Sequence, residues 1–171
     1  MRAICKTFFM ACLLLTAPAA LGQQRLGPHR FTLPEGFTIE AACSPGLCSR
    51  PITATLDEKG HLYVSDSSGS NEKVEQQLEK KPHRILRLED RDADGTYEKR
   101  TIFADRMMFP EGTLWHDGSL YVSAPPSIWK LTDTDGDGVC DRREEWFKGT
   151  LTGCANDLHG PYLGLDGWIY W

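Results

Sequence analysis

Two short motifs recur in the same order along this chain, and no other feature restricts its fold as strongly. The first, at 57–65 (DEKGHLYVS), returns at 116–123 (HDGSLYVS) and starts again at 165–170 (LDGWIY). The second, at 84–95 (RILRLEDRDADG), matches 127–138 (SIWKLTDTDGDG). A polar turn that ends in Gly, followed by apolar and β-branched residues, is typical of a tight β-hairpin. Units of about four short strands with a period in the forties are typical of β-propeller blades, so the sequence predicts an all-β fold built from such blades.

The repeats divide the chain into about three blade units, at 31–105, 106–149 and 150–171. The first unit is the longest because 67–81 is polar, and we interpret this stretch as an inserted loop with a short surface helix. A propeller closes as a ring of about four to eight blades. Three units, the last one incomplete, therefore predict an N-terminal fragment of a ring. The segment 37–42 is suited to an outer strand of the final blade. The alternative is that the matches are ordinary hairpins of a β-sandwich.

The N-terminus has the pattern of an export signal. Residues 1–22 combine two basic residues, an apolar run and a small-x-small ending in that order, as signal peptides do. We expect cleavage before Gln23, which leaves 23–171 as an exported domain in the periplasm or outside the cell. Residues 9–12 also resemble a lipoprotein box, which is the alternative for this segment. The apolar run is too short to span a bilayer, and no later stretch predicts a transmembrane segment.

The charge of the chain argues against one class of partner. The formal net charge is −5, with 19 basic and 24 acidic residues, and removal of the signal peptide would make it more negative. An acidic surface without a basic stripe repels nucleic acid. We therefore expect no nucleic-acid partner.

Four cysteines follow the predicted signal peptide: Cys43, Cys48, Cys140 and Cys154. An even number in an oxidising compartment favours disulfides, although four cysteines permit three pairings. A Cys43–Cys48 bridge is the first choice because a turn-forming Ser-Pro-Gly-Leu lies between the two, and Cys140 and Cys154 would form the second pair. Zinc is the alternative, but the spacing is wide and no His pair lies at ligand spacing.

The second motif contains a pattern typical of calcium loops. In 133–144, acids occupy positions 1, 3, 5, 9 and 12, with Gly138 at position 6, where a sharp turn is needed. The predicted ligands are the side chains of Asp133, Asp135, Asp137, Asp141 and Glu144 and the backbone carbonyl of Val139. A weaker copy offers Asp90, Asp92, Asp94 and Glu98, with Thr101 at position 12. The alternative is an acidic hairpin loop that only forms a turn and adds charge.

One histidine is a candidate for chemistry. His159 lies directly before the third hairpin motif, where a side chain can face the central channel of a propeller. Its neighbour Asp157 could fix the imidazole tautomer. The alternative is a His that only caps the turn. The other four, His29, His61, His83 and His116, lie beside turns or charged residues, and we expect them to be solvated. No nucleophile elbow, phosphate loop, nucleotide fingerprint or c-type haem motif occurs.

Taken together, several segments resemble a known family. These are PEGF at 34–37, GHLYV at 60–64, RLEDRDADG at 87–95, KRTIFAD at 99–105 and GLDGWIY at 164–170. They resemble the exported propellers of planctomycete-type bacteria that are labelled membrane-bound dehydrogenases. Those proteins are similar in turn to the six-bladed glucose/sorbosone dehydrogenases that use pyrroloquinoline quinone. The resemblance covers about 31–171.

This resemblance implies a function. The chain would be the N-terminal part of an oxidoreductase acting on a sugar or polyol, inactive by itself. In the quinone enzymes a channel-facing His ahead of a GPDGxLY hairpin is the base that takes the substrate hydroxyl proton. His159 matches that position, with Leu165 in place of the family Pro and a shorter spacing. The family's groups that hold the quinone and its calcium come from later blades. The second hypothesis is a non-catalytic, calcium-stabilised propeller that binds a glycan or a partner protein.

Overall fold

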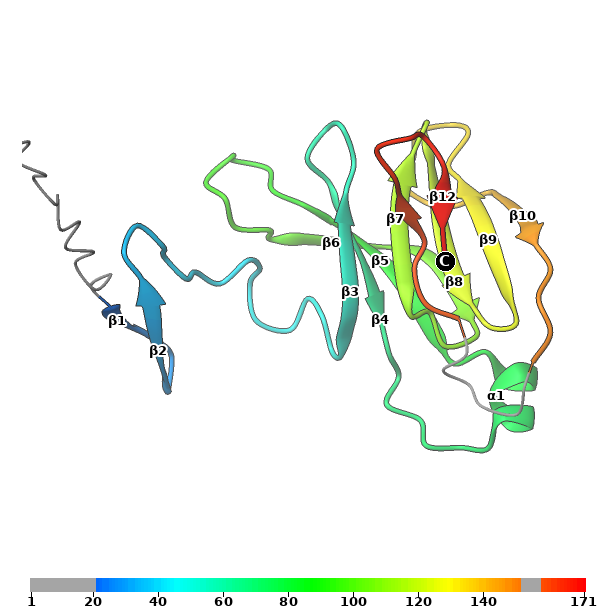
Figure 1. Cartoon of the computed structure of the whole chain (residues 1–171), viewed down its shortest axis with the longest axis horizontal. Coiled ribbons are helices and arrows are strands. Elements are labelled where there is room, and N and C mark those ends of the chain that lie inside the picture. Colours follow the sequence, from blue (N-terminus) through cyan, green and yellow to red (C-terminus); the bar gives the residue numbers. More distant parts are fainter. Residues whose placement is uncertain (1–20, 152–157) are drawn as a thin grey trace, which may run out of the picture. The chain divides into compact units, whose positions relative to one another are not determined.

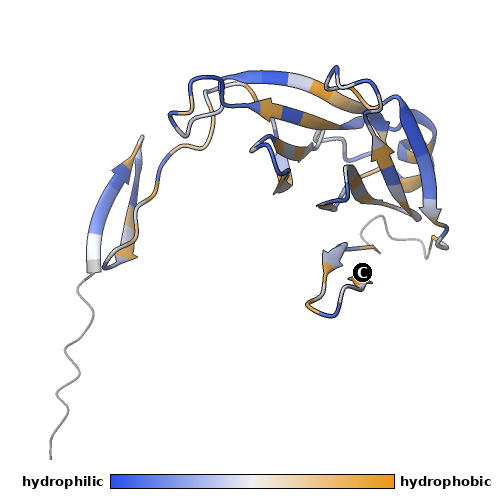
Figure 2. Cartoon of the chain, turned by 90° about the horizontal axis from the view of Figure 1, so that it is seen from above, coloured by the Kyte–Doolittle hydropathy of each residue, from blue (hydrophilic) through white to orange (hydrophobic). Residues whose placement is uncertain are grey.

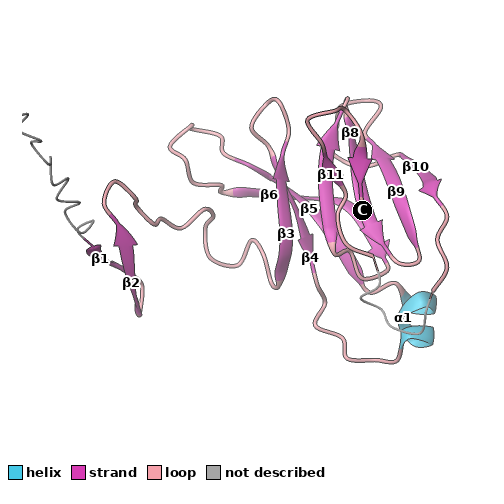
Figure 3. Ribbon diagram, viewed as in Figure 1, coloured by secondary structure: helices cyan, strands magenta, loops and turns pink. Residues whose placement is uncertain are grey.

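The computed structural model describes residues 21–151 and 158–171 (Figure 1). The chain divides into two compact units, one up to Ala41 and one from Ala42 to Trp171. Every strand pair in the described part is antiparallel, and the same part contains one short helix (Figure 3). The predicted all-β class is confirmed. None of the described helical residues forms a helix long and apolar enough to cross a membrane.

The first unit is a hairpin of β1 (Leu21–Leu26) and β2 (His29–Pro34). The side-chain amide of Gln24 donates to the carbonyl of Ile39 (2.8 Å) and accepts from its N–H (3.0 Å), which holds the following chain beside the hairpin. The strand predicted at 37–42 is not formed in the described chain, because no neighbouring strand pairs with this segment. Of the predicted signal peptide, residues 1–20 lie outside the described residues.

The second unit starts with a four-stranded meander. Its strands are β3 (Pro51–Leu56), β4 (Leu62–Asp66), β5 (His83–Glu89) and β6 (Lys99–Met107), which pair in sequence order. Helix α1 (Val74–Lys80) lies in the connection from β4 to β5, so the prediction of an inserted loop with a short helix is confirmed.

A second meander repeats the first. It contains β7 (Gly112–His116), β8 (Ser119–Ala124), β9 (Ser127–Thr132) and β10 (Arg142–Phe147), again in sequence order. The first strands of the two sheets lie near each other, where Thr53 and Thr113 share a hydroxyl–hydroxyl hydrogen bond of 2.8 Å. Consecutive four-stranded antiparallel meanders packed face to face are propeller-like blades. The fold class predicted from the repeat is therefore confirmed, and we call the two sheets blade 1 and blade 2.

The core lies between the two blades. All six residues of β8 are buried, as expected for a strand covered on both faces. Tyr63 stacks on Trp115 at 4.8 Å and meets the edge of Phe103 at 4.9 Å, which joins the blades through aromatic contacts. In Figure 2 the blade strands carry both apolar and hydrophilic residues, in keeping with one face turned to the core.

Within the second compact unit, β11 (Tyr162–Leu163) and β12 (Ile169–Tyr170) form a two-stranded sheet after blade 2, which we call the third unit. The buried hydroxyl of Ser123 donates to the carbonyl of Gly160 (2.7 Å). A Cβ at Gly112 would lie 1.3 Å from that carbonyl oxygen. The close approach of two backbones therefore requires glycine at position 112 and fixes the third unit against blade 2.

Candidate functional site

The two predicted calcium loops are the same connection in the two blades, joining β9 to β10 and β5 to β6. In blade 2, the amide of Gly138 donates to Oδ2 of Asp133 (2.8 Å). In blade 1, the amide of Gly95 donates to Oδ2 of Asp90 (2.9 Å). The two glycines have φ of +89° and +91°, in the region that disfavours other residues. The first acid of each loop therefore folds the chain back around itself in the same way.

The acid at position 9 of each loop repeats this correspondence. Asp141 accepts from the amide of Thr134 (3.1 Å), and Glu98 accepts from the amide of Arg91 (2.7 Å). These amides follow the first acid directly, so each loop is closed between its second and ninth positions. The repeat seen in the sequence thus extends to individual hydrogen bonds.

The carboxylates gather into two groups, Asp133 with Asp135 and Asp137, and Asp90 with Asp92 and Glu98. In each group, one oxygen per residue lies within 4.8 Å of the others. Calcium binds oxygens at about 2.3–2.6 Å, so two ligands of one ion lie at most about 5 Å apart. In addition, Oδ1 of Asp90 has almost no exposed surface and no hydrogen-bond partner in the described chain. Both groups therefore have the spacing of a site for a hard cation.

The other predicted ligands lie outside these groups. The carboxylate of Asp94 accepts from Thr96 N–H (2.7 Å). The Thr134 hydroxyl, which donates to Asp141, holds the pKa of that carboxyl below its usual range. Glu144 lies in β10 and pairs with Arg142 at 2.8 Å. A strand, unlike the helix of an EF-hand, does not return position 12 to the loop. Val139 lies within the loop, and its amide donates to Asp137 (2.8 Å).

The blade 2 loop also contacts blade 1. The amide of Cys140 donates to the carbonyl of Phe103 in β6 (2.7 Å). A Cβ at Gly138 would lie 2.3 Å from a guanidinium nitrogen of Arg87 in β5. The conformation of this loop is therefore coupled to the packing between the blades.

A cleft of about 290 Å³ lies beside the loop and is lined in part by Asp133 and Arg87. The nearly buried carboxylate of Asp57 pairs with Nδ1 of His61 (2.7 Å), and Nε2 of His61 lies 2.9 Å from Arg87. Burial alone would raise the pKa of Asp57, but the hydrogen bonds from His61 outweigh burial and the pKa lies below its usual range. Since both imidazole nitrogens are engaged, His61 is a structural link and has no free nitrogen to act as a base.

The position of His83 differs from its prediction. Expected to be solvated, it is 1% exposed. Its Nδ1 accepts from the amide of Ser68 (3.1 Å), Nε2 faces the amide oxygen of Gln77 (3.0 Å), and its ring meets Phe109 edge-on at 5.0 Å. Burial lowers the pKa of this imidazole. Gln77 belongs to the inserted helix α1. The burial of His83 beneath this helix could not be predicted from the residues next to His83 in the sequence.

His159 lies at the opposite end of the strands from the calcium loops, directly before β11. Its side chain is 66% exposed, and Nδ1 lies 3.7 Å from Oε2 of Glu111, whose side chain is 6% exposed. The predicted partner Asp157 lies outside the described residues. Glu111 was not predicted from the sequence. The available signal was its position directly before the first strand of a blade, which resembles the position of His159.

The predicted Cys43–Cys48 disulfide is not formed. Cys43, Cys48 and Cys140 are free thiols in the described part of the chain. Burial, together with the neighbouring Cys43, raises the pKa of Cys48 to about 11. Cys154 lies outside the described residues, so the Cys140–Cys154 pair stays a prediction.

Comparison with known proteins gives one family. The family model described as a domain of unknown function (DUF7133) matches residues 26–171. No curated protein and no solved structure matches the chain. The match neither supports nor opposes the resemblance to quinone-dependent dehydrogenases.

Proposed function

The chain belongs to the DUF7133 family, whose description assigns no activity, and we therefore propose a function from its geometry. The chain binds calcium in the corresponding loop of each blade, and the bound ions stabilise the packing of its propeller blades. The observation that carries this proposal is the convergence of three carboxylate oxygens within 4.8 Å in each loop. Hard cations prefer carboxylate and carbonyl oxygens at such spacing.

The physical argument rests on charge. Carboxylates gathered at this distance repel one another, and a divalent cation between them removes that repulsion. In blade 2 the same loop contacts Arg87 and Phe103 of blade 1. An ion that orders the loop therefore also stabilises the interface between blades. Calcium modules that work outside the cell have dissociation constants of about 10⁻⁴–10⁻³ M, and we expect this range here.

The test is thermal unfolding of the full chain with and without calcium. A ligand at about 20 times its dissociation constant stabilises the folded state by about 1.8 kcal/mol. We expect calcium at millimolar concentration to raise the melting temperature by several degrees. The double variant Asp135→Asn, Asp137→Asn keeps hydrogen-bond acceptors in the loop but removes two of the three gathered carboxylates, so it should lose about half of this response.

The matched control removes two exposed acids elsewhere. Glu75 and Glu79 lie in α1, outside both loops, and Glu75→Gln, Glu79→Gln should keep the full calcium response. If the unaltered chain is folded and shows no response at 10 times the weakest expected dissociation constant, about 10 mM, the proposal is wrong.

As a second function we propose that His159 accepts a proton from a hydroxyl group of a sugar or polyol, as the dehydrogenase resemblance implies. The supporting observation is the carboxylate of Glu111, 3.7 Å from Nδ1 and nearly buried. Such a group stabilises the imidazolium that forms when the other nitrogen takes a proton. The same carboxylate would repel an anionic quinone. The described residues beside His159 therefore do not fit pyrroloquinoline quinone, and we derive no step through it.

This second function is tested by NMR titration of the full chain with sugars and polyols. A ligand at this position should shift the imidazole signals of His159 saturably, and His159→Gln should abolish binding. His29→Gln is the control, because His29 lies in the separate N-terminal unit. Saturable binding that survives His159→Gln, or the absence of any shift, would contradict the assignment.

A further inference from the structure

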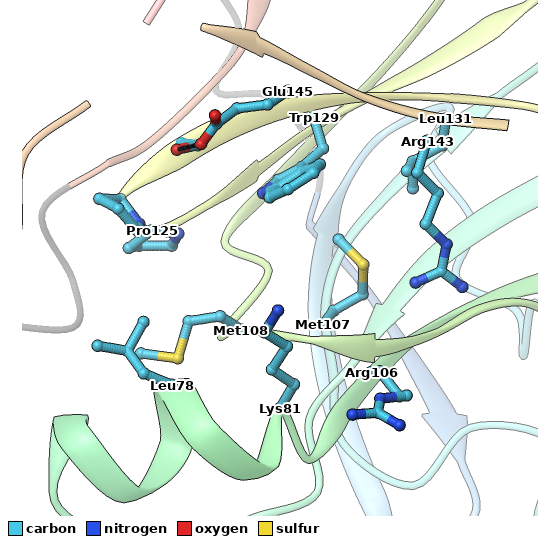
Figure 4. Close-up of a pocket in the computed structure, with 12 residues that line it drawn as sticks. Leu78, Lys81, Arg106, Met107, Met108, Pro125, Trp129, Leu131, Arg143 and Glu145 are labelled. Carbon is cyan, nitrogen blue, oxygen red and sulfur yellow. Dashed lines mark hydrogen bonds between the residues drawn. The ribbon is translucent and has the colours of Figure 1, made fainter. Parts of the chain in front are cut away.

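A cavity of about 250 Å³ lies between the blades (Figure 4). None of the carboxylates gathered in the two calcium loops lines it. Its walls come from α1, the end of β6, the turn between β8 and β9, and the strands β9 and β10. Apolar groups form much of the lining: Leu78, Met107, Met108, Pro125, Trp129 and Leu131. Met107, Met108 and Leu131 are at most 5% exposed, so the cavity is anchored in the core.

The charged groups around the cavity are unbalanced. Lys81, Arg106 and Arg143 line it, against the single acid Glu145. The carboxylate of Glu145 already accepts from the hydroxyl of Ser127 (2.6 Å). Arg143 donates to the carbonyl oxygen (2.8 Å) and the carboxylate (3.1 Å) of Asp105. Within the described chain, neither Lys81 nor Arg106 forms an ion pair, so two cationic groups are left for an anion.

Backbone strain points to Arg106. This residue has φ of +51°, in the left-handed region that costs a non-glycine residue about 1–2 kcal/mol. Strain of this kind accumulates at ligand sites. Lys81 has φ of +47°, but it is the left-handed C-cap of α1 and its N–H donates to the carbonyl of Gln77 (2.8 Å), so the helix end accounts for its conformation.

From these observations we propose that the cavity binds a small aromatic carboxylate. The volume is larger than the roughly 150 Å³ of a dry cavity that accommodates benzene, so one ring with a short acid chain fits. Thioethers such as those of Met107 and Met108 pack well against aromatic rings. The carboxylate would lie toward Lys81 and Arg106, which supply charge-assisted hydrogen bonds. This site is independent of calcium binding and of His159.

The test is calorimetric titration of the full chain with phenylacetate. We expect saturable 1:1 binding with a dissociation constant of about 1 mM or below. Phenylacetamide has the same ring without the charge, and acetate has the charge without the ring. Both should bind at least about tenfold more weakly, because each lacks one of the two recognised features.

Two variants locate the site. Lys81→Asn and Arg106→Asn remove one charge each and place a residue that tolerates positive φ, so both should fold. Each should weaken phenylacetate about tenfold without changing the binding of phenylacetamide. Lys130→Gln removes an equal charge next to Trp129 in sequence, but Lys130 lies over the ring of Tyr121 and does not line the cavity. It should bind normally. The proposal is overturned if phenylacetate does not bind, if phenylacetamide binds as tightly as phenylacetate, or if neither asparagine variant weakens the binding of phenylacetate.

Discussion

Replacing Gly112 with alanine should destabilise the chain strongly, because two backbones meet at this position. The added Cβ would lie 1.3 Å from the carbonyl oxygen of Gly160 and 2.4 Å from its carbon. Neither atom belongs to a flexible side chain, so the segment before β11 must move away. Overpacking of this kind costs about 1–3 kcal/mol. The movement also breaks the buried hydrogen bond from Ser123, which contributes about 1 kcal/mol. We expect Gly112→Ala to cost about 2–4 kcal/mol in total.

The assay is urea unfolding of the full chain, followed by tryptophan fluorescence and circular dichroism. Ser123→Ala removes the hydrogen bond without the clash and should cost only about 1 kcal/mol. The difference between the two variants then measures the clash itself. If Gly112→Ala lies within about 0.5 kcal/mol of the unaltered chain, the usual range of harmless substitutions, the third unit does not pack against blade 2 as described.

Three further predictions concern ionisable groups whose pKa is shifted by the fold. Burial lowers the pKa of His83, so the unfolded chain binds a proton below about pH 6.5 before the folded chain does. Stability should therefore fall as the pH drops from 6.5 to 5, and His83→Gln should flatten this slope in urea titrations. Asp66 is 1% exposed and bonded to Arg84. Burial alone would raise its pKa, but the donors from Arg50 and Arg84 outweigh burial and lower it. Asp66→Asn should cost about 2–3 kcal/mol at neutral pH. This loss should shrink as the pH falls below about 4, because the carboxyl of the unfolded chain then takes up a proton before that of the folded chain does; a pH-independent loss would contradict the ionic role. Finally, the pKa of about 11 makes Cys48 a poor nucleophile near pH 8. Alkylation of the folded chain should be slow at Cys48 and fast after unfolding, whereas a bridged Cys43–Cys48 peptide in mass mapping would restore the disulfide prediction.

The repeat made the blades predictable from sequence. Hairpin turns and strands of alternating apolar and polar residues are signals carried by neighbouring residues, so the two motifs at 57–65 and 84–95 located strands that the structure contains. The calcium loops could be predicted in the same way, since Asp133, Asp135 and Asp137 lie within a few residues of each other in the sequence. The spacing of the acids gave a wrong prediction for Glu144. The chain after the loop is a strand, which places this residue away from the other carboxylates.

The contacts that sequence could not predict join distant segments. Glu111 meets His159 only because the third unit packs against the start of blade 2. His83 is buried under an inserted helix, and Lys81 and Arg106 line one cavity from two different elements. The Cys43–Cys48 bridge was predicted from a short turn, but the structure keeps both thiols free. A turn sequence does not fix the side-chain directions that a disulfide requires.

Calcium stoichiometry tests the central claim most directly. Calorimetric titration of the full, metal-free chain should show two calcium ions bound, one in each loop. Asp133→Asn should remove one ion and Asp90→Asn the other, since each residue starts one loop and belongs to its carboxylate group. The double variant should bind none. Two ions that persist in the double variant, or no bound ion in a folded chain at about 10 mM calcium, would contradict a calcium-stabilised propeller.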